Sequence, residues 1–242
     1  MKTPIWLLGF ALTTTASAQI QFRSDLSETE IREKQEAYQE TLQQLQKARS
    51  KFKSAYDFAP TDVKRSEVIS SARAKITEAF LKEIFPAWYG TEWDFNGVTQ
   101  TPGEGQIACG YFVTTCLRDA GFNVQRVKLA QQASQRIIET VADPDTIKII
   151  YDKPMENVVD HLKKSSAGIY IVGLDKHTGF VVNDGENLAF IHSSYYRPPF
   201  SVTAEPIEGR NPLAHSKYRV FGKILSNEMI RKWIEGEAFE MK

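Results

Sequence analysis

Hydrophobic positions recur at helical spacing through residues 27–58, a polar, charged and Gln-rich stretch without Gly or Pro. Ser27 is followed three residues later by Glu30, a pairing that forms a capping box at the start of a helix. The pattern predicts one long amphipathic helix. Its apolar face consists of Ile31, Tyr38, Leu42, Leu45, Phe52 and Tyr56.

A second helix is predicted after the break at Ala59-Pro60. Thr61 stands at its N-cap position, and Pro86 predicts its end at Phe85 because a proline disfavours helical backbone in the residue before it. Its buried side is expected to contain Val63, Ile69, Ala72, Ile76, Phe80 and Ile84. We expect the two helices to form a hairpin that packs on the domain that follows. A partner-binding arm formed by residues 27–85 is the alternative.

From Trp88 onward, short β-rich runs alternate with helical ones. Helices are predicted at 111–120, 131–141, 155–164 and from Ser226 to about Gly236. Extended segments are predicted at 124–129, 146–151, 168–174, 179–183, 188–192 and 218–224. Asn183-Asp184-Gly185 has the residues of a tight turn between two of these strands. A helix that precedes a meander of antiparallel strands indicates an α+β fold.

The first 18 residues have the pattern of a secretory signal peptide. Lys2 supplies a positive start, residues 5–12 form a short apolar core, and Ala16-Ser17-Ala18 is a cleavage site. We therefore expect a periplasmic or secreted protein with no integral membrane segment after cleavage, and a retained N-terminal anchor is the alternative. The predicted organisation is a signal peptide at 1–18, a helical arm at 19–86 and a catalytic domain at 87–242.

The charges of the chain are balanced, with 30 Lys+Arg and 30 Asp+Glu. Without Lys2 the net charge is about −1, so no global field attracts nucleic acid or an anionic membrane. We therefore expect no nucleic-acid partner.

Cys109 and Cys116 are the two cysteines of the chain. On one helix their Cα atoms would lie about 10 Å apart, whereas a disulfide needs less than about 7 Å. We expect no disulfide between them, and Cys116 is predicted to face the core. The spacing differs from that of zinc sites and no His stands near either cysteine, so no metal or other cofactor is expected.

Cys109 is the candidate nucleophile. It follows the Gly-rich loop Pro102-Gly103-Glu104-Gly105 and opens a predicted helix, where the helix dipole lowers a thiol pKa and favours the thiolate. A buried cysteine that serves only as a small hydrophobic residue is the alternative.

Two histidines are candidates for the base and the group that orients it. His177 stands at the start of a predicted strand and His192 at the end of the next one. A hairpin centred near Asp184 brings the two side by side, so His177 is predicted to be the general base and His192 its orienting partner. A turn or surface position without a catalytic role is the alternative for each histidine.

These segments together resemble the NlpC-type family of papain-like cell-wall cysteine peptidases. Residues 90–97 resemble the family's G-T-P-Y-x-W-G-G segment, and Cys109 to Val113 its D-C-S-G-[FL]-V segment. His177 to Val181 resembles its H-V-G-[IF]-Y segment, and Phe190 to Ser193 its F-I-H-A segment. The resemblance covers about residues 88–195. Trp93 stands in place of a family tyrosine, and Ala108 in place of the family Asp.

The resemblance implies a papain-like α+β fold, with a nucleophile helix packed on an antiparallel sheet, and hydrolysis of amide bonds in peptidoglycan stem peptides. It also implies a Cys109–His177–His192 triad. The backbone N–H of Cys109 would contribute to an oxyanion hole, and Trp93, Gln106 and Gly110 would be substrate-binding or oxyanion residues. Two other functions remain open: a catalytically degenerate fold-mate that binds wall fragments or a partner protein, and an acyltransferase that acts on thioesters.

Overall fold

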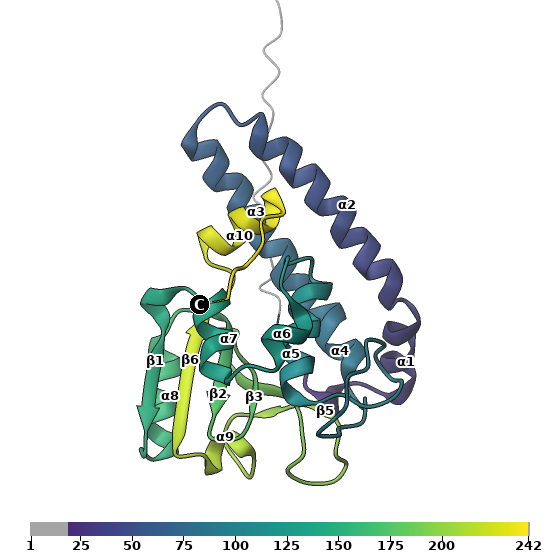
Figure 1. The fold of residues 1–242 in the computed structure, drawn as a ribbon, viewed down its shortest axis with the longest axis vertical. Helices are drawn as coiled ribbons and strands as arrows, with labels where there is room; N and C mark the ends of the chain where they lie inside the picture. The colour runs from purple at the N-terminus through teal and green to yellow at the C-terminus, as the bar shows by residue number, and fades with distance from the viewer. Residues whose placement is uncertain (1–18, 242) are drawn as a thin grey trace, which may run out of the picture.

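Six antiparallel strands form one sheet in the order β1-β6-β2-β3-β4-β5. The structure is a computed structural model that describes residues 19–241; the predicted signal peptide therefore lies outside the described residues. The predicted α+β class is confirmed (Figure 1). The strands are β1 Lys148–Tyr151, β2 Gly168–Leu174, β3 Thr178–Asn183, β4 Leu188–Ser193, β5 Val202–Pro206 and β6 Tyr218–Lys223.

The sheet buries both faces, because alternate residues of its central strands point to opposite sides. In β2, Ile169 and Ile171 join the larger core, whereas Tyr170 and Val172 join a smaller one. The larger core contains buried residues of α5 and α7, and the smaller one contains those of α8. The helices in this part of the chain are α5 Cys109–Asp119, α6 Arg126–Ala130, α7 Ser134–Val141, α8 Met155–Lys164, α9 Pro212–His215 and α10 Asn227–Glu235, with a short 3-10 turn, η3, at Pro144–Thr146.

The helical arm projects from the rest of the molecule (Figure 1). Its first predicted helix is two helices, α1 Glu28–Glu36 and α2 Tyr38–Asp57, which Ala37 separates. The capping box of Ser27 and Glu30 is confirmed. The break adjoins Tyr38, which is anchored in the core: its hydroxyl donates to Asp119 (2.8 Å) and accepts from Trp88 Nε1 (2.9 Å).

The second helix of the arm runs past its predicted end. It comprises α3 Asp62–Ala79, a π-helical segment η2 Phe80–Ile84 and α4 Phe85–Trp88. Pro86 lies in the first turn of α4, directly after the π-helical segment, and does not end the helix. The carbonyl of Lys82, four residues earlier, accepts from Lys34 Nζ (2.6 Å). The predicted buried position Val63 is exposed.

The arm packs on the sheet domain, in agreement with the prediction. One hydrophobic cluster includes Ile31 and Leu45 of the arm, Ile76 of α3 and Phe180 of the sheet. The arm and the domain therefore share a core rather than meeting as separate bodies.

The strand predicted at Val124 to Leu129 is wrong, since this stretch forms α6. Buried and exposed positions alternate, as in a strand, only from Phe122 to Arg126. The side chain of Arg126 is itself buried. It donates to Thr115 Oγ1 (2.7 Å) and to the carbonyl of Val98 (2.9 Å). The predicted helix at 131–141 begins only at Ser134, and the fifth strand in sequence, β5, was not predicted.

Candidate active site

Cys109 is the first residue of α5, as the sequence predicts. The segment before it is held against the sheet, because Ser193 Oγ at the end of β4 donates to the carbonyl of Ile107 (2.6 Å). The thiol is half-buried. Both Cys109 and Cys116 are free thiols, and Cys116 is buried in the core as predicted.

The expected lowering of the Cys109 pKa is not found. Burial raises the pKa of the thiol, and the backbone amides of Thr178, Gly110 and Cys109 offset that effect only in part. Two of these amides belong to the first turn of α5, so the helix end acts in the predicted direction but is outweighed by desolvation. The third amide, that of Thr178, shows that the thiol lies at the start of β3, next in sequence to His177.

His177 and His192 are in direct contact. His177 Nε2 and His192 Nδ1 are 2.8 Å apart, which confirms that the hairpin brings the two rings together. The β3–β4 register pairs Phe180 with Ile191, so it continues with Gly179 opposite His192. A Cβ on Gly179 would lie 2.8 Å from the Cβ of His192, and therefore a glycine at this position leaves room for the imidazole.

Glu205 extends the pair to a chain of three groups. Its Oε1 lies 3.0 Å from His192 Nε2, and its Oε2 accepts from Arg197 (2.8 Å). Burial alone would raise the pKa of this carboxyl, but His192 and Arg197 together lower it, so Glu205 is ionised at neutral pH. Glu205 lies on β5, and the sequence prediction missed both the residue and its strand.

An ionised Glu205 determines where the protons of both imidazoles are. A carboxylate only accepts, so His192 carries its proton on Nε2 and offers a bare Nδ1. His177 then donates its Nε2 proton to that atom and keeps a bare Nδ1 of its own. This Nδ1 is buried and has no hydrogen-bond partner among the described residues. The chain of hydrogen bonds therefore leaves the basic lone pair of His177 Nδ1 without a hydrogen-bond donor.

Both histidines are neutral. Burial and the adjacent His192 hold the pKa of His177 well below its usual range. Burial also lowers the pKa of His192, although Glu205 opposes that effect. The Cys109 thiol and both imidazoles are therefore uncharged in the resting protein, and His177 Nδ1 forms no hydrogen bond with any described residue.

Trp93 and Tyr195 form an aromatic wall beside the histidines. Their ring centroids are 5.7 Å apart, and the Tyr195 ring is 5.1 Å from that of His177. Burial and the nearby Cys109 raise the pKa of Tyr195, so its hydroxyl keeps its proton beside the thiol. Trp93 lacks the hydroxyl that the resemblance associates with this position, and Tyr195, which the sequence reasoning missed, places one near the same site.

Gln106 and Gly110 have different surroundings from each other. Gln106 is exposed and its amide donates to Glu92 Oε2 (3.3 Å). A Cβ on Gly110 would lie 2.6 Å from the carbonyl oxygen of Ala130, so only glycine lets the end of α6 approach α5 this closely. Gly110 therefore has a packing role in addition to its amide.

An open groove of about 790 Å³ runs along this side of the molecule. Trp93, Gln106, Arg197 and Glu205 line it, whereas Cys109 and His177 are not part of its lining. The groove therefore reaches Glu205, at the outer end of the histidine chain, and passes Trp93 of the aromatic wall.

Within residues 19–241, no three His, Cys, Asp or Glu side chains gather in a way that would hold a metal ion. No helix in the same part of the chain has the length and apolar character to span a bilayer.

Comparison with known proteins gives no relative: no family model, curated protein or solved structure matches the chain. The geometry of the site and the fold therefore carry the functional argument.

Proposed function

We propose that this protein is an exported cysteine hydrolase with a papain-like, NlpC-type fold that cleaves amide bonds in peptidoglycan stem peptides. The observation that carries the proposal is the buried Nδ1 of His177, which has no hydrogen-bond partner among the described residues. It stands at the free end of the His177–His192–Glu205 chain, and the backbone amide of the next residue, Thr178, acts on the Cys109 thiol. A basic lone pair in this position is what general-base activation of a thiol requires.

In the proposed reaction, Cys109 Sγ attacks the scissile carbonyl while its proton passes to His177 Nδ1. The carbonyl oxygen takes the electron pair and is stabilised by the first backbone N–H groups of α5. Collapse of this intermediate expels the amine, which takes the proton from Nδ1. Water then cleaves the thioester with the same group as base, and the acid product and the thiol are released.

His192 and Glu205 act when His177 becomes charged. The imidazolium keeps its hydrogen bond to His192 Nδ1, and the carboxylate stabilises the positive charge through His192. In this account Glu205 fixes the tautomers of the two histidines and stabilises the positive charge without touching the reacting atoms. The groove beside Trp93 and Glu205 would hold the peptide.

The test is digestion of purified peptidoglycan with the chain beginning at Gln19 and with its Cys109→Ala variant, followed by mass spectrometry of the soluble fragments. We expect new fragments from the wild type only, and their masses identify the bond. Cys116→Ser is the matched control, because it removes the other thiol, which is buried and away from the histidines. Equal fragments from the wild type and Cys109→Ala would exclude Cys109 as the nucleophile.

A second candidate is a catalytically degenerate fold-mate that binds wall fragments or a partner protein. The observation that favours it is the raised pKa of the Cys109 thiol. Alkylation with iodoacetamide separates the two functions. If His177 activates the thiol as a base, iodoacetamide alkylates Cys109 faster in the wild type than in a His177→Gln variant near neutral pH. Equally slow reaction in both proteins, with no fragments released, supports the binding module.

A further inference from the structure

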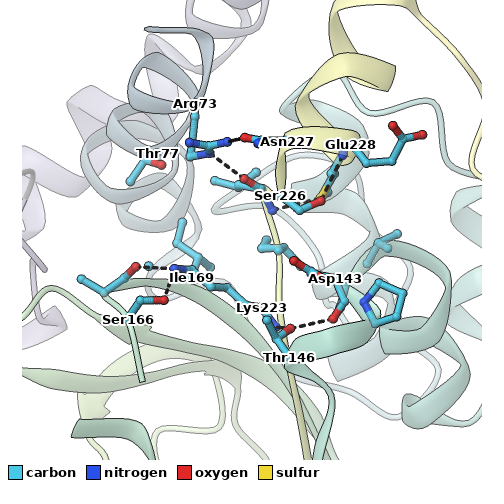
Figure 2. Close-up of a pocket in the computed structure, with 18 of the residues that line it drawn as sticks. Arg73, Thr77, Asp143, Thr146, Ser166, Ile169, Lys223, Ser226, Asn227 and Glu228 are labelled. Carbon is cyan, nitrogen blue, oxygen red and sulfur yellow. Dashed lines mark hydrogen bonds between the residues drawn. The ribbon is translucent and has the colours of Figure 1, made fainter. Parts of the chain in front are cut away.

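A second cavity, of about 800 Å³, lies at the other end of the central strands from the histidines. The end of β3 (Val182 to Asp184) and the start of β2 line it, together with α3, η3 and the first turn of α10 (Figure 2). Its volume lies within the range of about 300–1,000 Å³ that is typical of ligand pockets. No step of the proposed hydrolysis uses it.

Arg73 of α3 and Lys223 at the end of β6 line this cavity. A third cation of the lining, Lys232 of α10, lies with its Nζ 5.2 Å from the centre of the Phe239 ring. Arg73 donates from Nε to the carbonyl of Leu225 (2.8 Å) and contacts the Asn227 side chain. Lys223 Nζ donates to Ser166 Oγ (2.6 Å) and to a backbone carbonyl. All of these acceptors are neutral. Among the described residues neither Arg73 nor Lys223 has an ion-pair partner, so both charges are held in place without a counter-charge.

Arg73 and Lys223 also repel each other. Burial lowers the pKa of both Arg73 and Lys223, and for Lys223 the nearby charge of Arg73 lowers it further. Asp143 acts in the opposite direction, with a smaller effect than that of Arg73. The N-terminus of α10, a nine-residue helix capped by Ser226, lies against the same wall and adds a positive partial charge. Glu228 in the same first turn also lines the cavity, but its carboxylate is paired with Arg231 (2.8 Å). This side of the cavity therefore favours an anion.

Four carboxylates also line the cavity: Glu139, Asp143, Asp184 and Glu228. The backbone N–H of Asp143 donates to the carbonyl of Lys223 (2.9 Å), so these two residues are neighbours. Asp143 and Glu139 each accept one hydrogen bond from a neutral group, the backbone of Asp145 and the side chain of Gln135 respectively. Neither of these two carboxylates forms an ion pair within residues 19–241. Figure 2 shows Asp143 and Arg73 on different sides of the cavity. Apolar residues complete the lining: Leu81, Ile169, Val182, Ile224, Leu225, Met229 and Phe239.

We propose that this cavity binds a small zwitterion of the amino-acid and short-peptide class. Its carboxylate lies between Arg73 and Lys223 at the start of α10, and its ammonium group faces Asp143. The apolar lining contacts the body of the ligand. An anion alone would leave Asp143 unpaired, and a cation alone would leave Arg73 and Lys223 unpaired, so a molecule with both charges pairs with each of these groups. The inference does not depend on the hydrolase function.

The test is isothermal titration calorimetry of the full chain with the dipeptide Ala-Leu, its C-terminal amide, its N-acetyl form and inorganic phosphate. We expect saturable binding of the free dipeptide, and at least about tenfold weaker binding of either blocked form, since each loses a charge-assisted hydrogen bond. Cys109→Ala binds equally, which separates this site from the proposed hydrolysis.

The variants assign each end of the ligand. Lys223→Met weakens binding of the free dipeptide at least about tenfold but leaves binding of its C-terminal amide unchanged. Asp143→Asn also weakens binding of the free dipeptide at least about tenfold but leaves binding of the N-acetyl form unchanged. Lys75→Met is the matched control, because Lys75 is an exposed residue of α3 outside the cavity. Unfolding midpoints establish that each variant is folded. Absence of saturable binding to the folded wild type, binding unchanged in both cavity variants, or equal binding of phosphate and every peptide form would overturn the proposal.

Discussion

At the scale of single residues, the site depends on one carboxylate that does not touch the thiol. Glu205 is ionised because His192 and Arg197 offset its burial, and its charge determines the tautomer of two imidazoles in succession. The resting thiol and His177 are both uncharged, so in the proposed reaction the proton moves only when the thiol attacks a substrate. A site of this kind is sensitive to changes in Glu205 even where its shape is preserved.

Glu205→Gln keeps the shape of the side chain and removes its charge. The amide can donate to His192 as well as accept from it, so the bare Nδ1 of His177 is no longer enforced. We expect kcat/KM to fall by about 10²-fold or more, with a changed pH profile. Glu208→Gln, an exposed neighbour, should leave both unchanged. A variant of Glu205 with wild-type kcat/KM would show that the carboxylate plays no part in the reaction.

At the scale of the elements, α5, which begins with Cys109, is positioned by close backbone contacts. Gly110 admits the carbonyl of Ala130 at the end of α6, and Gly179 admits His192. The first contact joins α5 to α6 and the second joins β3 to β4, so the site is assembled by packing between these elements rather than by any one loop.

Gly110→Ala tests the α5–α6 contact. The added Cβ would lie 2.6 Å from the Ala130 carbonyl oxygen, so one helix must shift. We expect the free energy of unfolding to fall by about 1–3 kcal/mol in urea denaturation, together with a slower alkylation of Cys109. Lys128→Ala, an exposed change on α6, is the control. An unchanged unfolding midpoint in Gly110→Ala would mean that α6 can move away from α5 with no loss in the free energy of unfolding.

The sequence predicted elements well where a strong local pattern and a capping or turn signal coincide. The bounds of α8 and β2 agree with their predictions, and Ser226 and Gly236 delimit α10. The prediction failed at α6, because the burial of Arg126 depends on carbonyl groups near Val98 that are distant in sequence.

The triad candidates were predictable from the sequence, but Glu205 was not. A hairpin relates His177 to His192 through a short turn, so their contact follows from residue numbers alone. Glu205 pairs with β4 only after the longer segment 194–201, whose length does not define a register. The sequence marks β5 by the alternation of apolar and polar residues from Val202 to Glu205, which is short.

At the scale of the whole molecule, the arm and the sheet share one hydrophobic core that extends from Ile20 to Phe239. The buried Tyr38–Trp88–Asp119 network joins α2 to α5. We therefore expect the chain to unfold in one cooperative transition rather than arm first.

Tyr38→Phe removes the central hydroxyl of that network. Trp88 Nε1 loses its acceptor and Asp119 loses one donor, while the shape of the core is kept. We expect a loss of about 1–3 kcal/mol in the free energy of unfolding, seen at the same denaturant concentration by far-UV circular dichroism and by tryptophan fluorescence. Tyr151→Phe, at an exposed position, should have no effect. Two separate transitions would contradict a shared core.

Stability should also fall in mild acid. The folded pKa of His177 and of His192 lies below the ordinary value of 6.5, so the unfolded chain binds more protons as pH falls below that value. Their contribution is present above about pH 6.5 and is lost by up to about 1.4 kcal/mol per histidine per pH unit below it. Urea unfolding at several pH values should show a shallower loss in His177→Gln. Exposed His215→Gln is the control, and equal slopes in all three proteins would contradict the burial of His177 as a neutral group.

The hydrogen-bonded path from His177 through His192 to Glu205 crosses the sheet from the start of β3 to β4 and β5, instead of following the chain. Successive residues of a strand face opposite sides of a sheet, so the path survives only those changes in length that preserve which side each group faces. Natural variants should tolerate insertions in the turn after Asn183 when the strand pairing is kept. A single-residue insertion or deletion within β4 would instead turn His192 away from its partners. Parity of strand length, rather than conservation of loop sequence, is thus the feature by which related chains with an intact site should be recognised.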